Sequence, residues 1–189
     1  MNENDSYVAK ISEKIENISD SELKNLVTRL IDERNYLSEI VQIDPLTGLY
    51  NRRILPRIRK CSAVVMFDID DFKDINDSLG HDAGDNVIQK IGQIIKNNTR
   101  LSDYVCRTGG DEFLIAFTDC SLEVVSSRVE KICKEITDSI ELPNLHVTLS
   151  GGIASNKDNE SIEELMKKAD IALYKSKKEG KNRYNYYEE

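Results

Sequence analysis

The chain has 189 residues, of which 26 are Lys or Arg and 34 are Asp or Glu, so its formal net charge is −8 at pH 7. This excess of acid argues against general nucleic-acid binding, which requires a basic surface. The longest apolar runs, residues 63–67 and 113–117, are far shorter than the roughly 20 residues of a membrane-spanning helix. Residues 1–10 lack the cationic and apolar parts of a secretory signal. We therefore expect a cytoplasmic protein without a membrane span.

The four cysteines are too scattered to indicate a zinc cluster. None of them forms a CxxC pair, and the two histidines, His81 and His146, are not spaced with them as zinc ligands are. Cys106 and Cys133 lie in apolar segments, so we expect them to be core residues. Free thiols of this kind are typical of a reducing cytoplasm.

Residues 1–43 contain neither Gly nor Pro and are predicted to form a helical stalk. Apolar residues recur every three or four positions from Val8 to Ile18, and Ser19 with Glu22 is a capping-box signature for a second helix. The apolar stripe of this second helix consists of Leu23, Leu26, Val27, Leu30, Leu37, Ile40 and Val41. Either this helix packs on its own domain or it forms a dimerising stalk with an imperfect heptad, and we favour the stalk.

Residues 44–189 are predicted to form one mixed α/β domain. Asp44 and Pro45 end the stalk, and Gly48 permits a turn. Hydrophobic patterns then predict strands over residues 62–68, 104–107, 113–117 and 145–153, helices over residues 85–99, 121–139 and 161–179, and an edge strand over residues 184–187. This order is typical of an α/β (α+β) fold in which helices flank a mixed, mainly antiparallel sheet.

Two acidic clusters are associated with predicted strands. Asp68 directly follows an apolar strand, where a half-buried carboxylate requires a cation or several donors, whereas Asp70 and Asp71 could be helix caps. Asp111 and Glu112 lie at the tip of a predicted β-hairpin after two glycines, which let a ligand approach the backbone closely. Oxygen ligands without His or Cys select Mg2+ or Mn2+, ions that usually serve phosphate-bearing substrates. The alternative is a solvated acidic turn.

Residues 72–85 are polar and are predicted to be a ligand-binding loop between a strand and a helix. Asn76 and Asp85 offer the amide and carboxylate groups that can read the edge of a base. Lys73 lies close in sequence to the first acidic cluster and could hold a phosphate. His81, taken alone, is more typical of a structural residue.

Positive charge gathers near the C-terminal end. Residues 167–183 carry seven basic and two acidic side chains. This pattern fits a solvated helix end, where bases interact favourably with the helix dipole. It fits equally well a phosphate-binding surface that includes Lys177 and Lys181.

Five motifs, in order along the chain, are shared with a known family: DPLTGLYNRR (44–53), FDIDDFKDINDSLGHDAGD (67–85), RTGGDEF (107–113), VTLSGGIA (147–154) and ADIALYKSKKEGKNR (169–183). Over residues 44 to about 183, nearly all of the chain after the stalk, the sequence resembles the GGDEF domain of bacterial diguanylate cyclases. The resemblance implies a fold similar to the palm of polymerases and nucleotidyl cyclases. It also implies an enzyme that condenses two GTP molecules into cyclic di-GMP and two pyrophosphates, with one GTP bound by each subunit of a homodimer.

The same resemblance implies roles for individual residues. Asp68 and the backbone carbonyl of Ile69 would hold Mg2+ or Mn2+ ions. Asp111 would be a further ligand and would accept the proton of the 3′-hydroxyl group, and Glu112 would support the same metal cluster. Asn76 and Asp85 would bind the guanine, and His81 would line the nucleotide site. The phosphates would be bound by Lys73, Lys177 and Lys181. Lys73 would also be catalytic, because it would neutralise charge during phosphoryl transfer.

Further positions bear on affinity, specificity and control. Family members commonly carry Arg where this chain has Lys181, and lysine keeps the charge but loses the bidentate fork. Asp85 favours GTP, since members with mixed products tend to carry a smaller residue there. Arg100 and Asp103 match the family's RxxD inhibitory product site, to which a second arginine is expected to contribute. Two alternatives to a GTP-specific cyclase remain: an inactive module that binds GTP or cyclic di-GMP, and a cyclase with a mixed adenine–guanine product.

Overall fold

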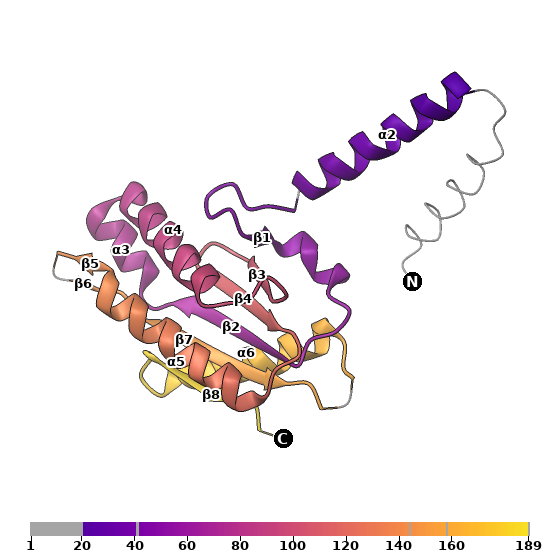
Figure 1. Cartoon of the computed structure of the whole chain (residues 1–189). Coiled ribbons are helices and arrows are strands. Elements are labelled where there is room, and N and C mark those ends of the chain that lie inside the picture. The colour runs from indigo at the N-terminus through magenta and orange to yellow at the C-terminus, as the bar shows by residue number, and fades with distance from the viewer. Residues whose placement is uncertain (1–20, 41, 144, 158, 189) are drawn as a thin grey trace. The chain divides into compact units, whose positions relative to one another are not determined.

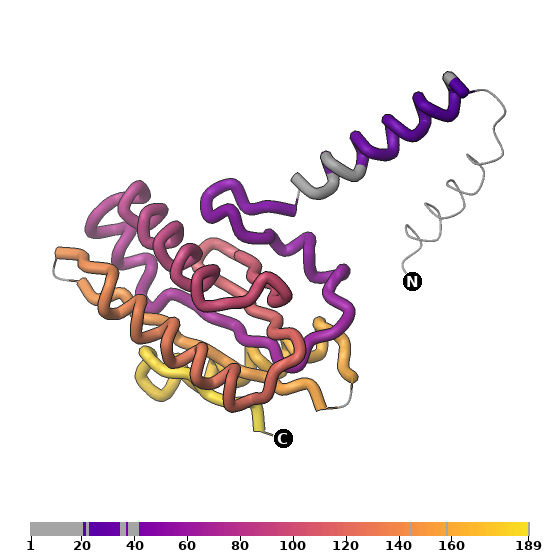
Figure 2. Tube along the Cα trace, viewed as in Figure 1, coloured from indigo at the N-terminus to yellow at the C-terminus, as the bar shows by residue number. Residues whose placement is uncertain are grey.

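The computed structural model describes residues 21–40, 42–143, 145–157 and 159–188 (Figures 1 and 2). The chain divides into two units, residues 1–41 and 42–189, so the division falls two residues before the predicted end of the stalk. The helix predicted from Val8 to Ile18 and the cap predicted at Ser19 lie outside the described residues.

The first unit contains helix α2, Ser21–Ile40. Leu23, Leu26, Leu30 and Leu37 all belong to the predicted apolar stripe, and each is about half exposed. A row of exposed leucines on a helix is typical of a surface that pairs with another helix. The dimerising stalk stays a prediction, which these leucines support.

The second unit is built on a six-stranded sheet with the strand order β1-β3-β4-β2-β7-β8. The inner neighbours are antiparallel, whereas the outermost pairs, β1 with β3 and β7 with β8, are parallel. The strands are β1 (Tyr50–Asn51), β2 (Ala63–Ile69), β3 (Tyr104–Arg107), β4 (Glu112–Phe117), β7 (Leu149–Ser155) and β8 (Arg183–Tyr186), and the short strands β5 (Glu141–Leu142) and β6 (Leu145–His146) pair separately. The structure confirms the predicted mixed, mainly antiparallel sheet and the edge strand predicted near the C-terminus of the chain.

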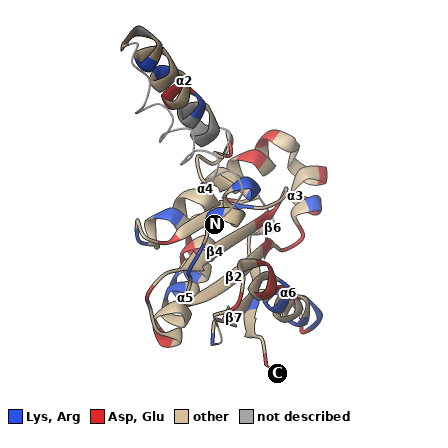
Figure 3. Ribbon diagram, turned by 90° about the vertical axis from the view of Figure 1, so that its right-hand side faces the viewer, with Lys and Arg blue, Asp and Glu red and all other residues tan. Residues whose placement is uncertain are grey.

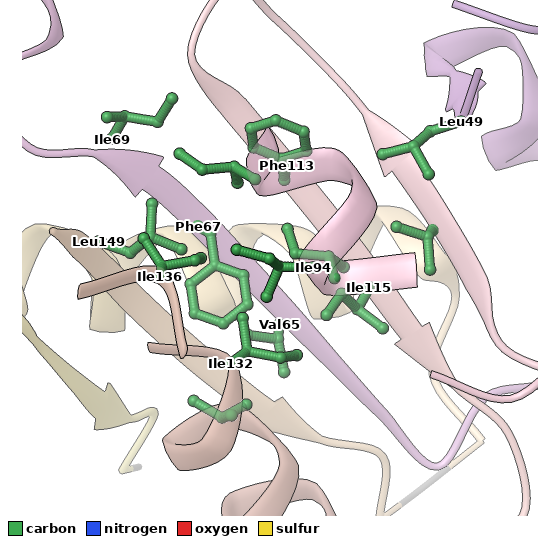
Figure 4. Packing of buried hydrophobic residues seen from close by; sticks show 14 of the residues in the cluster. Leu49, Val65, Phe67, Ile69, Ile94, Phe113, Ile115, Ile132, Ile136 and Leu149 are labelled. Atoms are coloured by element: carbon green, nitrogen blue, oxygen red, sulfur yellow. The ribbon is translucent and has the colours of Figure 1, made fainter. Parts of the chain in front are cut away.

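Helices cover both faces of this sheet (Figure 1). They are η1 (Arg52–Arg57), α3 (Phe72–Leu79), α4 (His81–Asn97), α5 (Leu122–Ser139) and α6 (Ile162–Lys178). Alternate residues of β2 face opposite sides, because side chains alternate along a strand. Val65 and Phe67 pack with α4 and α5, where Figure 4 shows Phe67 beside Ile136, while Val64 and Met66 pack with η1 and α6.

Helix α6 lies very close to β7. A Cβ atom placed on Gly152 would be 2.0 Å from the carbonyl oxygen of Ala169 and 2.3 Å from the backbone nitrogen of Leu173. The hydroxyl of Ser176 donates to the carbonyl of Gly151 at 2.6 Å. Gly152 has no side chain, and this is why the C-terminal half of α6 can lie against the sheet.

Residues 72–85, predicted as a polar loop, are instead helical. They form α3 and the first turn of α4, which are joined at Gly80 with a φ of +85°. Ile75 is buried and Phe72 packs against the same core, so these two residues are the apolar side of a short helix. The prediction was wrong because it relied on the polar composition of the segment, although Phe72, Ile75 and Leu79 recur at helical spacing.

Two predicted boundaries also differ. Helix α4 begins at His81 rather than at residue 85, and the strand predicted over residues 145–153 is divided into β6 and β7. The start predicted for the last helix is confirmed by a complete capping box, in which the Ser161 hydroxyl accepts from the backbone of Glu164 and the Glu164 carboxylate accepts from the backbone of Ser161.

The cysteines of the described residues are free thiols. Cys106 is buried and Cys133 is partly buried against the core, and burial raises the pKa of each thiol to about 12. Both therefore behave as the small core residues that were predicted. Within the part of the chain that the structure describes, no helix is long and apolar enough to cross a membrane.

We expect Gly152→Ala to destabilise the second unit by about 3 kcal/mol, because the new methyl group would overlap backbone atoms of α6 that cannot rotate away. Urea unfolding followed by circular dichroism measures this change. Gly110→Ala is the matched control, since a Cβ atom there meets nothing within 4 Å, and it should change stability by less than about 0.5 kcal/mol. Equal losses in the two variants would contradict the close contact of α6 with β7.

Candidate active site

Asp68 and Glu112 lie opposite each other at one end of the sheet. They are partners in the antiparallel register of β2 and β4, so their side chains leave the same face with Cβ atoms about 5 Å apart. Asp111 joins the same end through its backbone, because the N–H of Ile69 donates to its carbonyl at 3.2 Å. The structure thus brings the two acidic clusters predicted from the sequence to one place.

The glycines of the hairpin tip make room for the Glu112 carboxylate. A Cβ atom on Gly109 would be 2.7 Å from Oε2 of Glu112. The shape of the tip is held by Arg107, which donates from Nε and Nη2 to the carbonyl of Gly110 at 3.1 and 2.7 Å. A side chain at residue 109 would displace the Glu112 carboxylate from this position.

Arg107 also connects the hairpin tip to the segment that follows α2. Its Nη1 atom lies 3.3 Å from both carboxylate oxygens of Asp44. Burial raises the pKa of Asp44, but hydrogen bonds from Thr47 and the charge of Arg107 outweigh burial and hold this pKa below its ordinary value. The sequence pattern indicated only a turn here and gave no sign of the ion pair.

Lys177 of α6 reaches the acidic cluster. Its Nζ atom lies 2.7 Å from Oδ2 of Asp68. Figure 3 shows basic residues on α6. Burial nevertheless raises the pKa of Asp68, and the charge of Asp111 adds to the rise. Burial and the neighbouring carboxylates also raise the pKa of Glu112. The cluster therefore holds more negative charge than one lysine neutralises.

The residues of this cluster fit a hard divalent cation. Asp68, Glu112 and the backbone carbonyl of Ile69 offer oxygen ligands at one strand end. Among the described residues, no three acidic, His or Cys side chains form a complete metal cage, and Asp111 is placed here by its backbone. This set suits Mg2+, which usually takes one or two protein carboxylates and completes its shell with water and substrate phosphates.

Helices α3 and α4 present the predicted nucleotide-binding residues. Asn76 packs against α4, where a Cβ atom on Gly84 would be 2.1 Å from its Oδ1 atom. Asp85 follows that glycine directly and is exposed. Lys73, in the first turn of α3, and His81, at the start of α4, are also exposed. The structure brings Asn76 beside the helical turn that carries Asp85, and it places Lys73 and His81 where a ligand can reach them.

The helix-cap interpretation was wrong for Asp70 and holds for Asp71 only in its position. Asp71 occupies the N-cap position of α3 but makes no side-chain cap hydrogen bond. Its Oδ1 atom instead lies 2.5 Å from Nζ of Lys181, a hydrogen bond that raises the pKa of that lysine. Asp70 is buried, and its carboxylate accepts hydrogen bonds from β7 and from the segment after α6. Both carboxylates thus serve contacts distant in sequence, which a local cap pattern could not show.

The RxxD residues meet an arginine that the sequence did not locate. The Asp103 side chain is only 1% exposed and lies 3.2 Å from Nη1 of Arg128 on α5. It also accepts from the backbone N–H groups of Arg100 at 2.8 Å and Thr118 at 3.0 Å. Arg128 is the only arginine in the sequence of α5, but nothing in the linear pattern relates α5 to residues 100–103.

Comparison with known proteins agrees with this geometry. Residues 41–183 match the family described as "Diguanylate cyclase, GGDEF domain", and the chain belongs to this family. Diguanylate cyclase DosC of Escherichia coli K12 is 36% identical across 86% of this chain and 40% of the relative, and diguanylate cyclase A of Treponema denticola is 40% identical across 64% and 34%. The chain thus spans about two fifths or less of the length of these relatives.

Solved GGDEF structures share the fold. The GGDEF domain of DgcB from Caulobacter crescentus, in complex with c-di-GMP, matches with a TM-score of 0.71 and 31% identity over 78% of this chain and 96% of that one. A structure of the coiled coil and GGDEF domain of the same protein, also with c-di-GMP, matches with a TM-score of 0.75 and 27% identity over 96% and 99%. The fold that the sequence resemblance implied is confirmed.

We expect Glu112→Gln to raise the unfolding temperature at pH 7 in buffer containing EDTA, because it removes one of several like charges. The raised pKa of Glu112 means that the folded state binds protons more tightly than the unfolded state. Stability of the unaltered chain therefore falls as pH rises above the ordinary glutamate pKa, and the advantage of the variant should vanish on acidification.

Thermal unfolding between pH 4 and pH 8 measures this effect, since pH 4 is about the ordinary pKa of a glutamate. Glu164→Gln is a control of opposite sign, because the backbone and hydroxyl of Ser161 lower the pKa of Glu164. The charged Glu164 carboxylate therefore stabilises the folded chain above the ordinary glutamate pKa, and this stabilisation is lost as pH falls. Glu164→Gln should be less stable than the unaltered chain at pH 7. Destabilisation of both variants at pH 7 would contradict repulsion within the acidic cluster.

Proposed function

We propose that this chain is a diguanylate cyclase, which joins two GTP molecules into cyclic di-GMP and releases two pyrophosphates. The observation that carries the proposal is the Asp68–Glu112 pair, in register at a strand end beside the backbone of Asp111 and with Lys177 2.7 Å from Asp68. Oxygen ligands with an adjacent lysine are what metal-assisted phosphoryl transfer requires. Because GTP is the proposed substrate, we place the reaction in the cytoplasm.

In the proposed reaction the 3′-oxygen of one GTP attacks the α-phosphorus of the other. The new bond joins that oxygen to phosphorus, the bond from phosphorus to pyrophosphate breaks, and Asp111 accepts the proton of the 3′-hydroxyl. Asp68, Glu112 and the carbonyl of Ile69 would hold Mg2+ or Mn2+, which neutralises charge on the phosphate oxygens when bound. The same step with the roles of the two nucleotides exchanged closes the ring.

The remaining residues position the nucleotide. The asparagine and aspartate of the α3–α4 pair, Asn76 and Asp85, bind the guanine edge, and His81 lines the site. The carboxylate of Asp85 accepts hydrogen bonds from N–H groups that guanine has and adenine lacks, so it selects GTP over ATP. The phosphates are bound by Lys73, Lys177 and Lys181, whose charges oppose the negative charge of the reacting groups.

The reaction needs two copies of the chain, because each bound nucleotide attacks the other. We therefore propose a homodimer that meets at the catalytic face and pairs through α2. The half-exposed leucines at positions 23, 26, 30 and 37 support pairing of α2. The DgcB structure that matches 96% of this chain contains a coiled coil together with its GGDEF domain, which also supports this pairing.

Arg100, Asp103 and Arg128 form the proposed inhibitory site for the product. Arg128 adds the second arginine that the resemblance calls for, 3.2 Å from the Asp103 carboxylate. Both DgcB structures are complexes with c-di-GMP. The same observations favour the second candidate function, a module that binds GTP or cyclic di-GMP without turnover.

One assay decides between these functions. The purified full chain is incubated with GTP and Mg2+, and the products are identified by liquid chromatography with mass detection, beside an Asp111→Asn variant. We expect cyclic di-GMP from the unaltered chain and a rate at least about 100-fold lower from the variant, because the proton acceptor is lost. Adding ATP to the assay tests for a mixed product.

No product at protein concentrations that span dimer formation would contradict an active cyclase in the full chain. Deletion of residues 1–43 would then distinguish an enzyme held inactive by its stalk from a binding module, since only the former gains activity on deletion. Binding of cyclic di-GMP by an inactive, shortened chain would establish the module.

We expect Arg100→Ala to raise the concentration of cyclic di-GMP needed for half-inhibition by about tenfold or more, because one charged contact to the product phosphates is lost. Initial rates with increasing added product measure this midpoint. Asp103→Ala should give the same loss of inhibition and also lower the unfolding temperature, since its buried carboxylate holds Arg128 and Thr118. Unchanged inhibition in both variants would exclude this site.

A further inference from the structure

We propose that Asp70 is a positioning residue for the phosphate-binding side chain of Lys181. Its buried carboxylate holds the strained turn at Lys181 and Asn182 against the end of β2. This inference rests on the proposed function, because it takes the triphosphate of GTP as the ligand of Lys181.

The turn after α6 has a strained backbone. Gly180, Lys181 and Asn182 follow one another with φ values of +108°, +61° and +47°. Glycine adopts such conformations freely and asparagine tolerates them, but a lysine in this region is uncommon. Strained residues persist only when their surroundings fix them, and they cluster at functional sites. The contacts that fix this turn therefore indicate what positions Lys181.

The Asp70 carboxylate is the buried anchor of the turn. The residue is 5% exposed, and its Oδ2 atom accepts from the backbone N–H of Asn182 at 3.0 Å and from the hydroxyl of Thr148 at 2.6 Å. Its Oδ1 atom accepts from the hydroxyl of Ser150 at 2.6 Å. Its own N–H donates to the carbonyl of Thr148 at 3.0 Å. Three donors satisfy the carboxylate, and only one of them belongs to the turn.

Three acids after the apolar run of β2 engage the segment that ends α6. Asp68 pairs with Lys177 and Asp71 pairs with Lys181. Asp70 binds the backbone N–H of Asn182, in the turn between α6 and β8. The Lys181–Asp71 pair is 42% and 58% exposed, so it is worth little and a phosphate can replace it. Asp70 is buried and contacts backbone, so its bond stays when the lysines turn to substrate.

A structural and a positioning role for Asp70 are separable, because Ser150 offers a matched control. Ser150 is completely buried, and its hydroxyl donates to the same carboxylate rather than to the turn. Ser150→Ala removes one hydrogen bond of the anchor and leaves the bond to Asn182. Asp70→Ala removes all three hydrogen bonds of the carboxylate, including the one from Asn182. Asp70→Asn is the conservative variant, since its amide oxygen can still accept from Asn182 while the Ser150 hydroxyl turns to accept from its amide N–H.

The test measures binding rather than turnover. The full chain in Mg2+ buffer is titrated with a GTP analogue that carries a methylene group between the α- and β-phosphates, and guanosine binding is followed by ligand-observed NMR. We expect Asp70→Ala to weaken analogue binding by about tenfold or more and to leave guanosine binding unchanged, since only phosphate contacts are misplaced. Ser150→Ala should lower the unfolding temperature with less than a threefold change in analogue binding, and Asp70→Asn should restore most of the affinity.

A double variant tests whether Asp70 acts through Lys181. If it does, Asp70→Ala should have little further effect on analogue binding in a Lys181→Ala background. Where Asp70→Ala does not fold, Asp70→Glu replaces it, because a carboxylate longer by one methylene in this buried site displaces the turn and should weaken analogue binding in the same way.

Three results would overturn the proposal. They are unchanged analogue binding in Asp70→Ala, equal losses for analogue and guanosine, and additive losses in the double variant. If the unaltered chain fails to bind the analogue, the proposed function itself is contradicted and this proposal with it. If the unaltered chain and Asp70→Ala bind the analogue alike, only the role of Asp70 is excluded.

Discussion

The structure depends on an electrostatic constraint: several carboxylates must be held together at one end of a sheet. The antiparallel register fixes Asp68 opposite Glu112, and the hairpin tip adds Asp111 through its backbone. Burial and mutual repulsion raise the pKa values of Asp68 and Glu112, so the cluster is costly in the absence of cations. A site of this kind is stabilised when a divalent ion and a phosphate-bearing ligand enter it, which links its instability to its proposed chemistry.

The positive charge that offsets this cluster comes from the other end of the chain. Helix α6 brings Lys177 to Asp68, and it can do so because Gly152 lets the helix lie against β7. The turn that follows α6 brings Lys181 to Asp71, and the buried Asp70 carboxylate binds the backbone of that turn. Packing of a helix on a sheet and hydrogen bonding of a strained turn thus decide where two lysine charges lie.

The longer strands and the acidic clusters could be predicted from the sequence because each depends on neighbouring residues, whereas the two-residue strands β1 and β5 were not predicted. An apolar run followed by Asp68 predicts a strand that ends in a carboxylate, and two glycines before Asp111 predict an open hairpin tip. Helix α3 was not predicted because polar residues dominate its sequence, although Phe72, Ile75 and Leu79 recur at helical spacing. The partner of Asp103 on α5 and the donors to Asp70 were also not predicted, since these contacts depend on how distant segments pack.

Arg107 shows how a contact of this long-range kind shapes the site. Its guanidinium group donates twice to the carbonyl of Gly110 and lies 3.3 Å from both oxygens of Asp44. The side chains of the Arg107–Asp44 pair are 15% and 16% exposed, so this pair is screened less than a surface ion pair. Thr47 holds the same Asp44 carboxylate with two further hydrogen bonds. Hydrogen bonds therefore join the first turn of the second unit to the tip of the acidic hairpin, and neither can move without breaking charge-assisted hydrogen bonds of the other.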